Sequence, residues 1–118
     1  MNYTNSIREY LNRDIEAFNK LNIEEINNAM EAIYHAWERG STIYVMGNGG
    51  SAATASHMVC DFNKGVSLNT GRKFKFICLN DNIPIITAIA NDISYDKIFE
   101  LQLKDVVTKD DLVLAISG

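Results

Sequence analysis

Apolar and polar residues follow two different patterns along the chain. Before residue 40, apolar residues recur three and four positions apart, as on one face of a helix. This spacing predicts an amphipathic helix over residues 6–21 and a second helix that begins after an Asn22 N-cap and ends at Gly40. After residue 40, short apolar runs alternate with segments of helical pattern. The runs predict strands over residues 42–46, 73–79 and 112–116.

The alternation of strands and helices predicts an α/β fold with a doubly wound parallel sheet. The first strand is apolar almost throughout, which is typical of a strand buried on both faces. Helices are expected over residues 52–62 and 94–106, with a short helix between them that has Pro84 in its first turn and runs through Ala90. A polar loop is expected over residues 63–71. We assign residues 1–40 to an N-terminal helical arm with a packing helix, and residues 41–118 to an incomplete α/β domain. No helix follows the third strand, so we expect a sheet truncated there.

Composition narrows the classes of partner. The chain has 118 residues, 47% of them hydrophobic, and a net charge of −4, which argues against nucleic acid as a main partner. No apolar run is long enough to span a membrane, and the first residues lack the core of a signal peptide. We therefore expect a cytoplasmic protein with Cys60 and Cys78 as buried free thiols. The basic residues Arg72, Lys73 and Lys75 fit a solvated strand edge.

The stretch from Gly47 to Ser51 is the strongest functional signal. It joins the first predicted strand to a helix, where unpaired backbone N–H groups gather and attract anions. Gly49 and Gly50 would let a ligand approach the backbone, while the Asn48 amide and the Ser51 hydroxyl add donors. We interpret the stretch as a phosphate-ester cradle. A P-loop is excluded because no Gly-Lys-Ser/Thr follows, whereas dinucleotide binding and a ligand-free turn stay open.

Other polar residues are expected near this turn, because ligands of such sheets bind beyond the carboxyl ends of the strands. Asn80–Asp81 and Ser117–Gly118 end the second and third strands. Ser117 is either a turn residue or a hydroxyl donor to phosphate. Asn91 and Asp92 either cap the following helix or bind sugar hydroxyls.

His57 and Asp61 lie four residues apart in the predicted helix after the glycine turn, and so on one face of it, about one turn beyond the cradle. The pair could be a solvent-facing ion pair, two ligands of a divalent metal, or a carboxylate base beside an orienting imidazole. Two ligands do not make a zinc site, so a metal would need further residues.

The run Gly47-Asn48-Gly49-Gly50-Ser51-Ala52-Ala53, with His57 and an acidic residue at 61, strongly resembles the sugar isomerase (SIS) domain, and within it the phosphoheptose isomerases. Residues 87–92 and 111–117 resemble further segments of that family. The resemblance implies a three-layer SIS fold with a five-stranded parallel sheet. It also implies a helical arm used to form a homotetramer, with active sites at subunit interfaces.

The activity implied is the isomerisation of sedoheptulose 7-phosphate to a heptose 7-phosphate, through an enediol, for lipopolysaccharide, capsule or other glycoconjugates. The resemblance makes Asp61 the catalytic residue, in place of a family Glu that is one methylene longer. His57 matches a position that is a zinc ligand in some members, and the acidic residue at the position of Asp61 can also be a ligand there. The sequence itself requires no cofactor. It assigns substrate binding to seven positions: Asn48, Gly49, Gly50, Ser51, Asn91, Asp92 and Ser117. The rival interpretation is a non-catalytic SIS module, either a sugar-phosphate-sensing regulator or an adaptor of a replication initiator.

Overall fold

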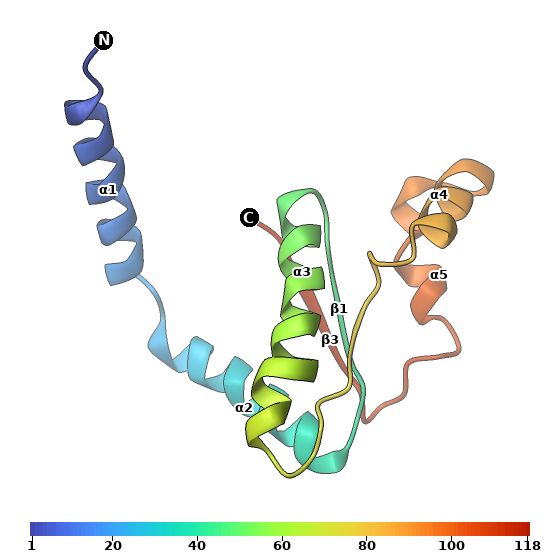
Figure 1. Ribbon diagram of the computed structural model, residues 1–118. Coiled ribbons are helices and arrows are strands. Elements are labelled where there is room, and N and C mark those ends of the chain that lie inside the picture. Colours follow the sequence, from blue (N-terminus) through green and yellow to red (C-terminus); the bar gives the residue numbers. More distant parts are fainter. The chain divides into compact units, whose positions relative to one another are not determined.

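The computed structural model describes all 118 residues, which form two compact units, Met1–Glu31 and Ala32–Gly118. Figure 1 shows helices and strands that alternate after the first two helices, as predicted. No helix has the length and apolarity needed to cross a membrane. The elements are α1 Thr4–Asn19, α2 Ile23–Arg39, β1 Ile43–Gly47, α3 Gly50–Cys60, η1 Asp61–Gly65, η2 Val66–Asn69, β2 Phe76–Cys78, α4 Ile83–Asp92, η3 Tyr95–Lys97, α5 Glu100–Leu103 and β3 Leu112–Ile116.

The first unit consists of α1 and the start of α2. The predicted N-cap is confirmed, because Asn22 Oδ1 accepts hydrogen bonds from the backbone N–H groups of Glu24 and Glu25 at 3.1 and 3.3 Å. Helix α1 contains no buried residue. Its large apolar side chains are all at least half exposed: Ile7, Tyr10, Leu11, Ile15 and Phe18. The amphipathic pattern of α1 thus has no core to pack against within this unit.

The second unit contains a parallel three-stranded sheet in the order β2-β1-β3. Helix α3 connects β1 to β2, and α4, η3 and α5 connect β2 to β3 on the other side of β1. Because β2 and β3 lie on opposite sides of β1, the sheet is doubly wound, and the predicted α/β class is confirmed. Such an arrangement creates a topological switch point between β1 and β3.

The core lies on one face of this sheet. Ile43 and Val45 of β1 are completely buried, as are Ala36 of α2 and Ala55 of α3. Small residues on both helices allow close packing over the apolar strand, and burial of each large aliphatic side chain contributes about 1.5–3 kcal/mol. Helix α3 is therefore held firmly above the carboxyl end of β1.

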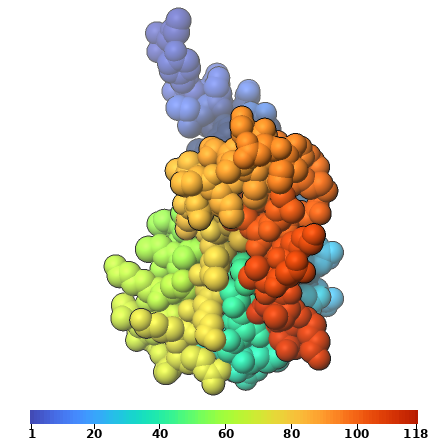
Figure 2. Space-filling view, turned by 90° about the vertical axis from the view of Figure 1, so that its right-hand side faces the viewer, coloured from blue at the N-terminus to red at the C-terminus, as the bar shows by residue number.

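The opposite face of the sheet is more open. Figure 2 shows β2, β1 and β3 side by side in yellow, teal and red. Tyr44 of β1 is buried, but the neighbouring residues in register, Ile77 and Val113, are 47% and 38% exposed.

The predicted polar loop over residues 63–71 is wrong, because the chain continues as the π-helical η1 and the 3₁₀-helical η2. Side chains of these turns satisfy the backbone of the edge strand β2. Asn63 both donates to Phe76 O and accepts from Phe76 N, each at 2.9 Å. Ser67 Oγ donates to Phe62 O and accepts from Phe74 N. These long-range bonds stabilise a turn that local sequence preferences do not reveal.

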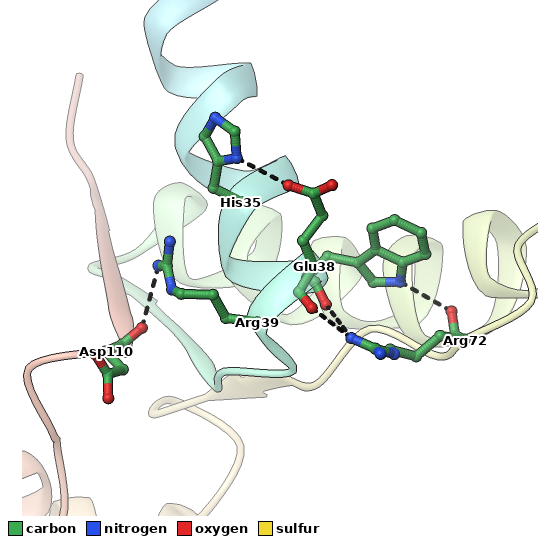
Figure 3. Close-up of polar contacts among 6 residues, drawn as sticks. His35, Glu38, Arg39, Arg72 and Asp110 are labelled. Atoms are coloured by element: carbon green, nitrogen blue, oxygen red, sulfur yellow. Dashed lines mark hydrogen bonds and ion pairs between the residues drawn. The ribbon is translucent and has the colours of Figure 1, made fainter.

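The basic residues Arg72, Lys73 and Lys75 are exposed beside the edge strand β2, as predicted, and Arg72 also caps the end of α2 (Figure 3). Arg72 Nη1 donates to the carbonyl oxygens of Trp37 and Glu38, and Trp37 Nε1 donates to Arg72 O at 2.9 Å. Lys75 Nζ donates to the carbonyl oxygen of Gly40 at 2.8 Å. Cations are favourable at this end of a helix, where the last carbonyl groups lack partners.

Two further expectations need correction. The helix expected over residues 94–106 is split into η3 and α5, and it stops early because the backbone of Lys104 is already non-helical, with φ −57° and ψ 129°. Both cysteines are free as predicted, but Cys60 is exposed and only Cys78 is buried. Burial raises the pKa of the Cys78 thiol.

The alignment of β1 with β3 generates a stability prediction at Asp111. Its carboxylate accepts hydrogen bonds from Thr42 N and from the N–H and hydroxyl of Thr108, all at 2.8 Å. The backbone N–H groups of Thr108 and Thr42 lower the pKa of Asp111 below 3.8. We expect Asp111→Asn to reduce the free energy of unfolding by about 1 kcal/mol at pH 7, allowing for solvent around the carboxylate.

The same prediction has a pH dependence. Because the pKa is lowered on folding, the stabilisation is present above the ordinary carboxyl pKa and disappears as the pH falls through the folded value. Denaturant unfolding of the two proteins at pH 7 and at successively lower pH values below 3.8 checks this. A difference in stability that stays constant over this range would contradict the role given to the Asp111 charge.

Candidate functional site at the glycine turn

The turn between β1 and α3 is fixed by two glycines with different requirements. A Cβ atom on Gly47 would lie 2.7 Å from the backbone carbon and Cβ of Ser51, so only glycine fits there. Gly49 has φ 56°, a left-handed conformation that costs other residues about 1–2 kcal/mol. These two constraints bring the first turn of α3 directly against the end of β1.

The turn uses some of its amide groups and leaves others free. The N–H groups of Ser51 and Ala52 donate to Asn48 O and Gly49 O at 3.0 and 3.1 Å. The N–H groups of Gly49 and Gly50 make no hydrogen bond within the chain. Free amides at the N-terminus of a helix are suited to bind an anion.

Asn80, at the end of β2, holds the turn in place. Its Oδ1 accepts from Gly47 N at 3.0 Å, and its Nδ2 donates to Gly47 O at 2.8 Å. The carboxamide makes the two hydrogen bonds that the backbone of a neighbouring strand would make, and so satisfies both backbone groups of Gly47. Since its polar atoms are engaged in this way, Asn80 supports the site instead of meeting a ligand.

A cavity of about 450 Å³ opens beside the turn, between the ends of β1 and β3. Its position is the topological switch point, where ligands of doubly wound sheets bind. The cavity is lined by Met46, Gly47, Asn48, Ser51, Phe99, Ala115, Ile116, Ser117 and Gly118. All of these side chains are neutral, so a bound anion would be held by N–H and O–H dipoles and by the helix terminus.

The comparison with protein families decides what kind of fold this is. Residues 2–118 match the family model described as the SIS domain. The chain belongs to the SIS domain family. Because the family match covers nearly the whole chain, we interpret the glycine turn as part of an SIS domain and not as a dinucleotide-binding turn.

Individual relatives and solved structures agree with that assignment. The chain is 38% identical over 110 residues to a probable phosphoheptose isomerase of Thermoplasma acidophilum, covering 93% of this chain and 60% of the relative. It is 32% identical to the phosphoheptose isomerase of Clostridium acetobutylicum, with 96% and 60% covered. The chain thus spans about 60% of the length of the relatives it matches.

Two solved structures share the SIS fold. The phosphoheptose isomerase of Francisella tularensis superposes with a TM-score of 0.85 at 26% identity, over 100% of this chain and 63% of that one. GmhA, the phosphoheptose isomerase of Neisseria gonorrhoeae, has a TM-score of 0.85 at 24% identity, over 99% and 61%, and shows the fold alone.

Three residues predicted for the SIS site line the cavity: Asn48, Ser51 and Ser117. Gly49 and Gly50 belong to the turn beside it. Asn91 and Asp92 do not line the cavity; they form the exposed last turn of α4, where Asn91 Nδ2 donates to Asp92 Oδ1 at 2.8 Å. In this arrangement they do not cap the following helix. Their assignment to the substrate stays a prediction.

The pair His57 and Asp61 lies on a different part of α3. Their side chains are 76% and 61% exposed, and His57 Nε2 lies 3.5 Å from Asp61 Oδ1. Asp61 follows Ser51 by ten residues, which corresponds to about 15 Å along a helix. The pair instead lines a separate hollow with Ala53, Thr54 and Met58. Within one chain, Asp61 therefore does not reach the cavity at the glycine turn.

The residues present do not form a zinc site by themselves. The chain contains no group of three or more His, Cys, Asp or Glu residues placed to hold a metal ion. His57 and Asp61 supply two donors, whereas a zinc site takes at least three protein ligands. Any zinc site that includes them needs ligands from elsewhere.

Sequence reasoning missed two aromatic residues of the site. Tyr95 Oη donates to Asn48 Oδ1 at 2.7 Å, and Phe99 lines the cavity. They lie four residues apart within the segment predicted as a helix over residues 94–106, and nothing in that pattern connects them with the glycine turn. A spacing of four residues places both side chains on one face of a helix. Only the fold shows that this face lies next to the glycine turn.

The steric requirement at Gly47 gives a direct test of the turn. We expect Gly47→Ala to lower the free energy of unfolding by about 1–3 kcal/mol, since its Cβ would displace Ser51. Gly50→Ala is the matched control, because no atom lies within 4 Å of its added Cβ. Chemical denaturation measures both, and equal effects of the two substitutions would show that the close approach of Gly47 to Ser51 is not needed.

Proposed function

We propose that the protein is a sugar-phosphate isomerase that interconverts sedoheptulose 7-phosphate and a heptose 7-phosphate. The observation that carries this proposal is the cavity at the switch point of an SIS domain, lined by neutral hydrogen-bond donors next to free helix-terminal amides. Relatives named phosphoheptose isomerase support the choice of substrate.

The substrate's phosphate would be held by the hydroxyl groups of Ser51 and Ser117 and by the amides of Gly49 and Gly50. Both serines line the cavity, and the two free N–H groups lie at the N-terminus of the 11-residue helix α3. Hydrogen bonds to an anion are roughly twice as strong as neutral ones, so these dipoles replace a missing cationic side chain. Asn48 would then meet an oxygen of the sugar.

The reaction is a proton transfer between neighbouring carbons. A base removes a proton from C1 of the ketose while the C2 carbonyl oxygen gains a proton, which forms the enediol. A proton returned to C2, with loss of the proton on O1, yields the aldose. A carboxylate is suited to carry this proton. Asp61 is our candidate, with its shorter side chain in the position of the family's Glu.

A second copy of the chain would bring Asp61 to the cavity, which it does not reach within its own chain. Asp61 of one protomer would serve the glycine turn of another, which agrees with the active sites at subunit interfaces implied by the family resemblance. The exposed apolar side chains of α1 would supply a self-association surface. We propose a homotetramer on this basis.

Cofactor, pathway and location follow from the same proposal. The proton transfer written above needs no cofactor, and no step passes through zinc. If zinc binds, His57 and Asp61 would supply two of its ligands. A heptose 7-phosphate would feed lipopolysaccharide, capsule or related glycoconjugate synthesis in the cytoplasm.

Asp61 gives the sharpest test of the isomerase proposal. We expect Asp61→Asn to reduce kcat at least about 100-fold in the intact protein, because the amide cannot accept the proton. Asp61→Glu, which restores the family's carboxylate, should keep activity. Conversion of sedoheptulose 7-phosphate to aldose measures both variants. Undiminished turnover in Asp61→Asn would remove Asp61 from the mechanism.

A mixing experiment extends this test to the shared site. Asp61→Asn and Ser117→Ala proteins should each be weakly active, whereas unfolding and refolding them together at equal amounts should restore activity. In mixed assemblies, about a quarter of the sites would combine an intact Ser117 with an intact Asp61 from another copy. Mixed assemblies without any recovered turnover would contradict the assignment of these residues to different protomers.

A further inference from the structure

Tyr95 contacts the candidate site through a single polar bond. Its hydroxyl donates to Asn48 Oδ1 at 2.7 Å, across 47 positions of the sequence. An O–H···O bond of this length is close to the optimum. No other side chain of the second unit donates to the Asn48 carboxamide, so Tyr95 is its one side-chain partner.

The segment that carries Tyr95 is anchored to the sheet. Ile98, three residues on, is only 2% exposed. Gln102 Nε2 donates to Ile98 O at 2.7 Å and to Leu79 O, just beyond β2, at 3.1 Å. The buried side chain and the double hydrogen bond hold η3 and the start of α5 against the end of β2. Tyr95 thus extends to Asn48 from a fixed base.

The same segment forms a wall of the cavity. Phe99 follows Tyr95 by four residues and lines the cavity, as does Ser117. Figure 2 shows this part of the chain, in orange, against the carboxyl-terminal residues in red. One short segment therefore both bounds the cavity and contacts its asparagine.

The bond determines which atoms of Asn48 are available to a ligand. A carboxamide has one oxygen acceptor and two N–H donors. Because the oxygen of Asn48 is bonded to Tyr95 and the residue lines the cavity, the N–H donors are left for a ligand. A rotated carboxamide would instead present its oxygen to the oxygen atoms of a sugar, which is unfavourable.

We propose that Tyr95 is a positioning residue: its hydroxyl orients the Asn48 carboxamide so that Nδ2 donates to the sugar oxygen that gains negative charge as the enediol forms. This inference rests on the proposed isomerase function. Tyr95 contacts Asn48 and does not line the cavity, so we assign it a positioning role and not a catalytic one. Its effect should fall on kcat more than on KM, since the Asn48 bond strengthens as charge develops.

The test uses Tyr95→Phe in the intact protein, with Tyr44→Phe as the control. Tyr44 is a buried tyrosine of β1 that does not line the cavity. We expect Tyr95→Phe to lower kcat by about three- to tenfold, the range for loss of one neutral hydrogen bond, and to change KM by less than about twofold. Tyr44→Phe should leave both constants unchanged.

A double-substitution cycle separates positioning from a general structural role. In an Asn48→Ala background, Tyr95→Phe should have no further effect on kcat, because its target is gone. A loss of kcat as large as in the Asn48-containing protein would overturn the inference. The Asn48 side-chain amide signals in the ¹⁵N NMR spectrum should also shift in Tyr95→Phe, and unchanged signals would show that the bond is absent.

These outcomes are distinct from failure of the proposed function. If the unsubstituted protein does not convert sedoheptulose 7-phosphate, the isomerase proposal fails and the catalytic role of Tyr95 fails with it. If that protein is active but the two substitutions have additive effects, only the inference about Tyr95 fails.

Discussion

The close approach of α3 to the end of β1 is the constraint on which the site depends. Gly47 has no side chain, and for that reason Ser51 can lie directly against it. Asn80 then satisfies both backbone groups of Gly47 from the neighbouring strand. Gly47 thus connects the end of β1 with the N-terminus of α3 and with the end of β2. These contacts fix the direction of the free N–H groups of the turn.

The architecture separates binding groups from the candidate proton-transfer group. Neutral donors gather at the switch point, whereas the Asp61 carboxylate lies on an exposed face about three turns farther along α3. A helix can thus present its N-terminus to one ligand and its distal face to another. In the homotetramer that we propose, each α3 helix would contribute to two sites.

The sequence predicts the features that depend on local patterns. The alternation of strands and helices, the Asn22 cap, the glycine turn and the cavity position of Ser117 all follow from periodicity, residue type and the rule for strand ends. The helical turns after Asp61 do not, because Asn63 and Ser67 stabilise them through bonds to distant backbone groups.

The same reason explains why Arg72 and Tyr95 were not predicted to act as they do. Arg72 caps a helix that ends more than 30 residues earlier, and Tyr95 contacts an asparagine 47 residues away. Neither contact has a local signal in the sequence. Both contacts are tertiary hydrogen bonds between residues far apart in the sequence.

The most direct measurement of the central claim is an NMR titration of the intact protein with inorganic phosphate, followed through backbone amide shifts. Binding at the glycine turn should move the signals of Gly49, Gly50, Ser51 and Ser117 together, with a single dissociation constant. Shifts confined to the basic residues Arg72 and Lys75, with the glycine signals unmoved, would contradict it.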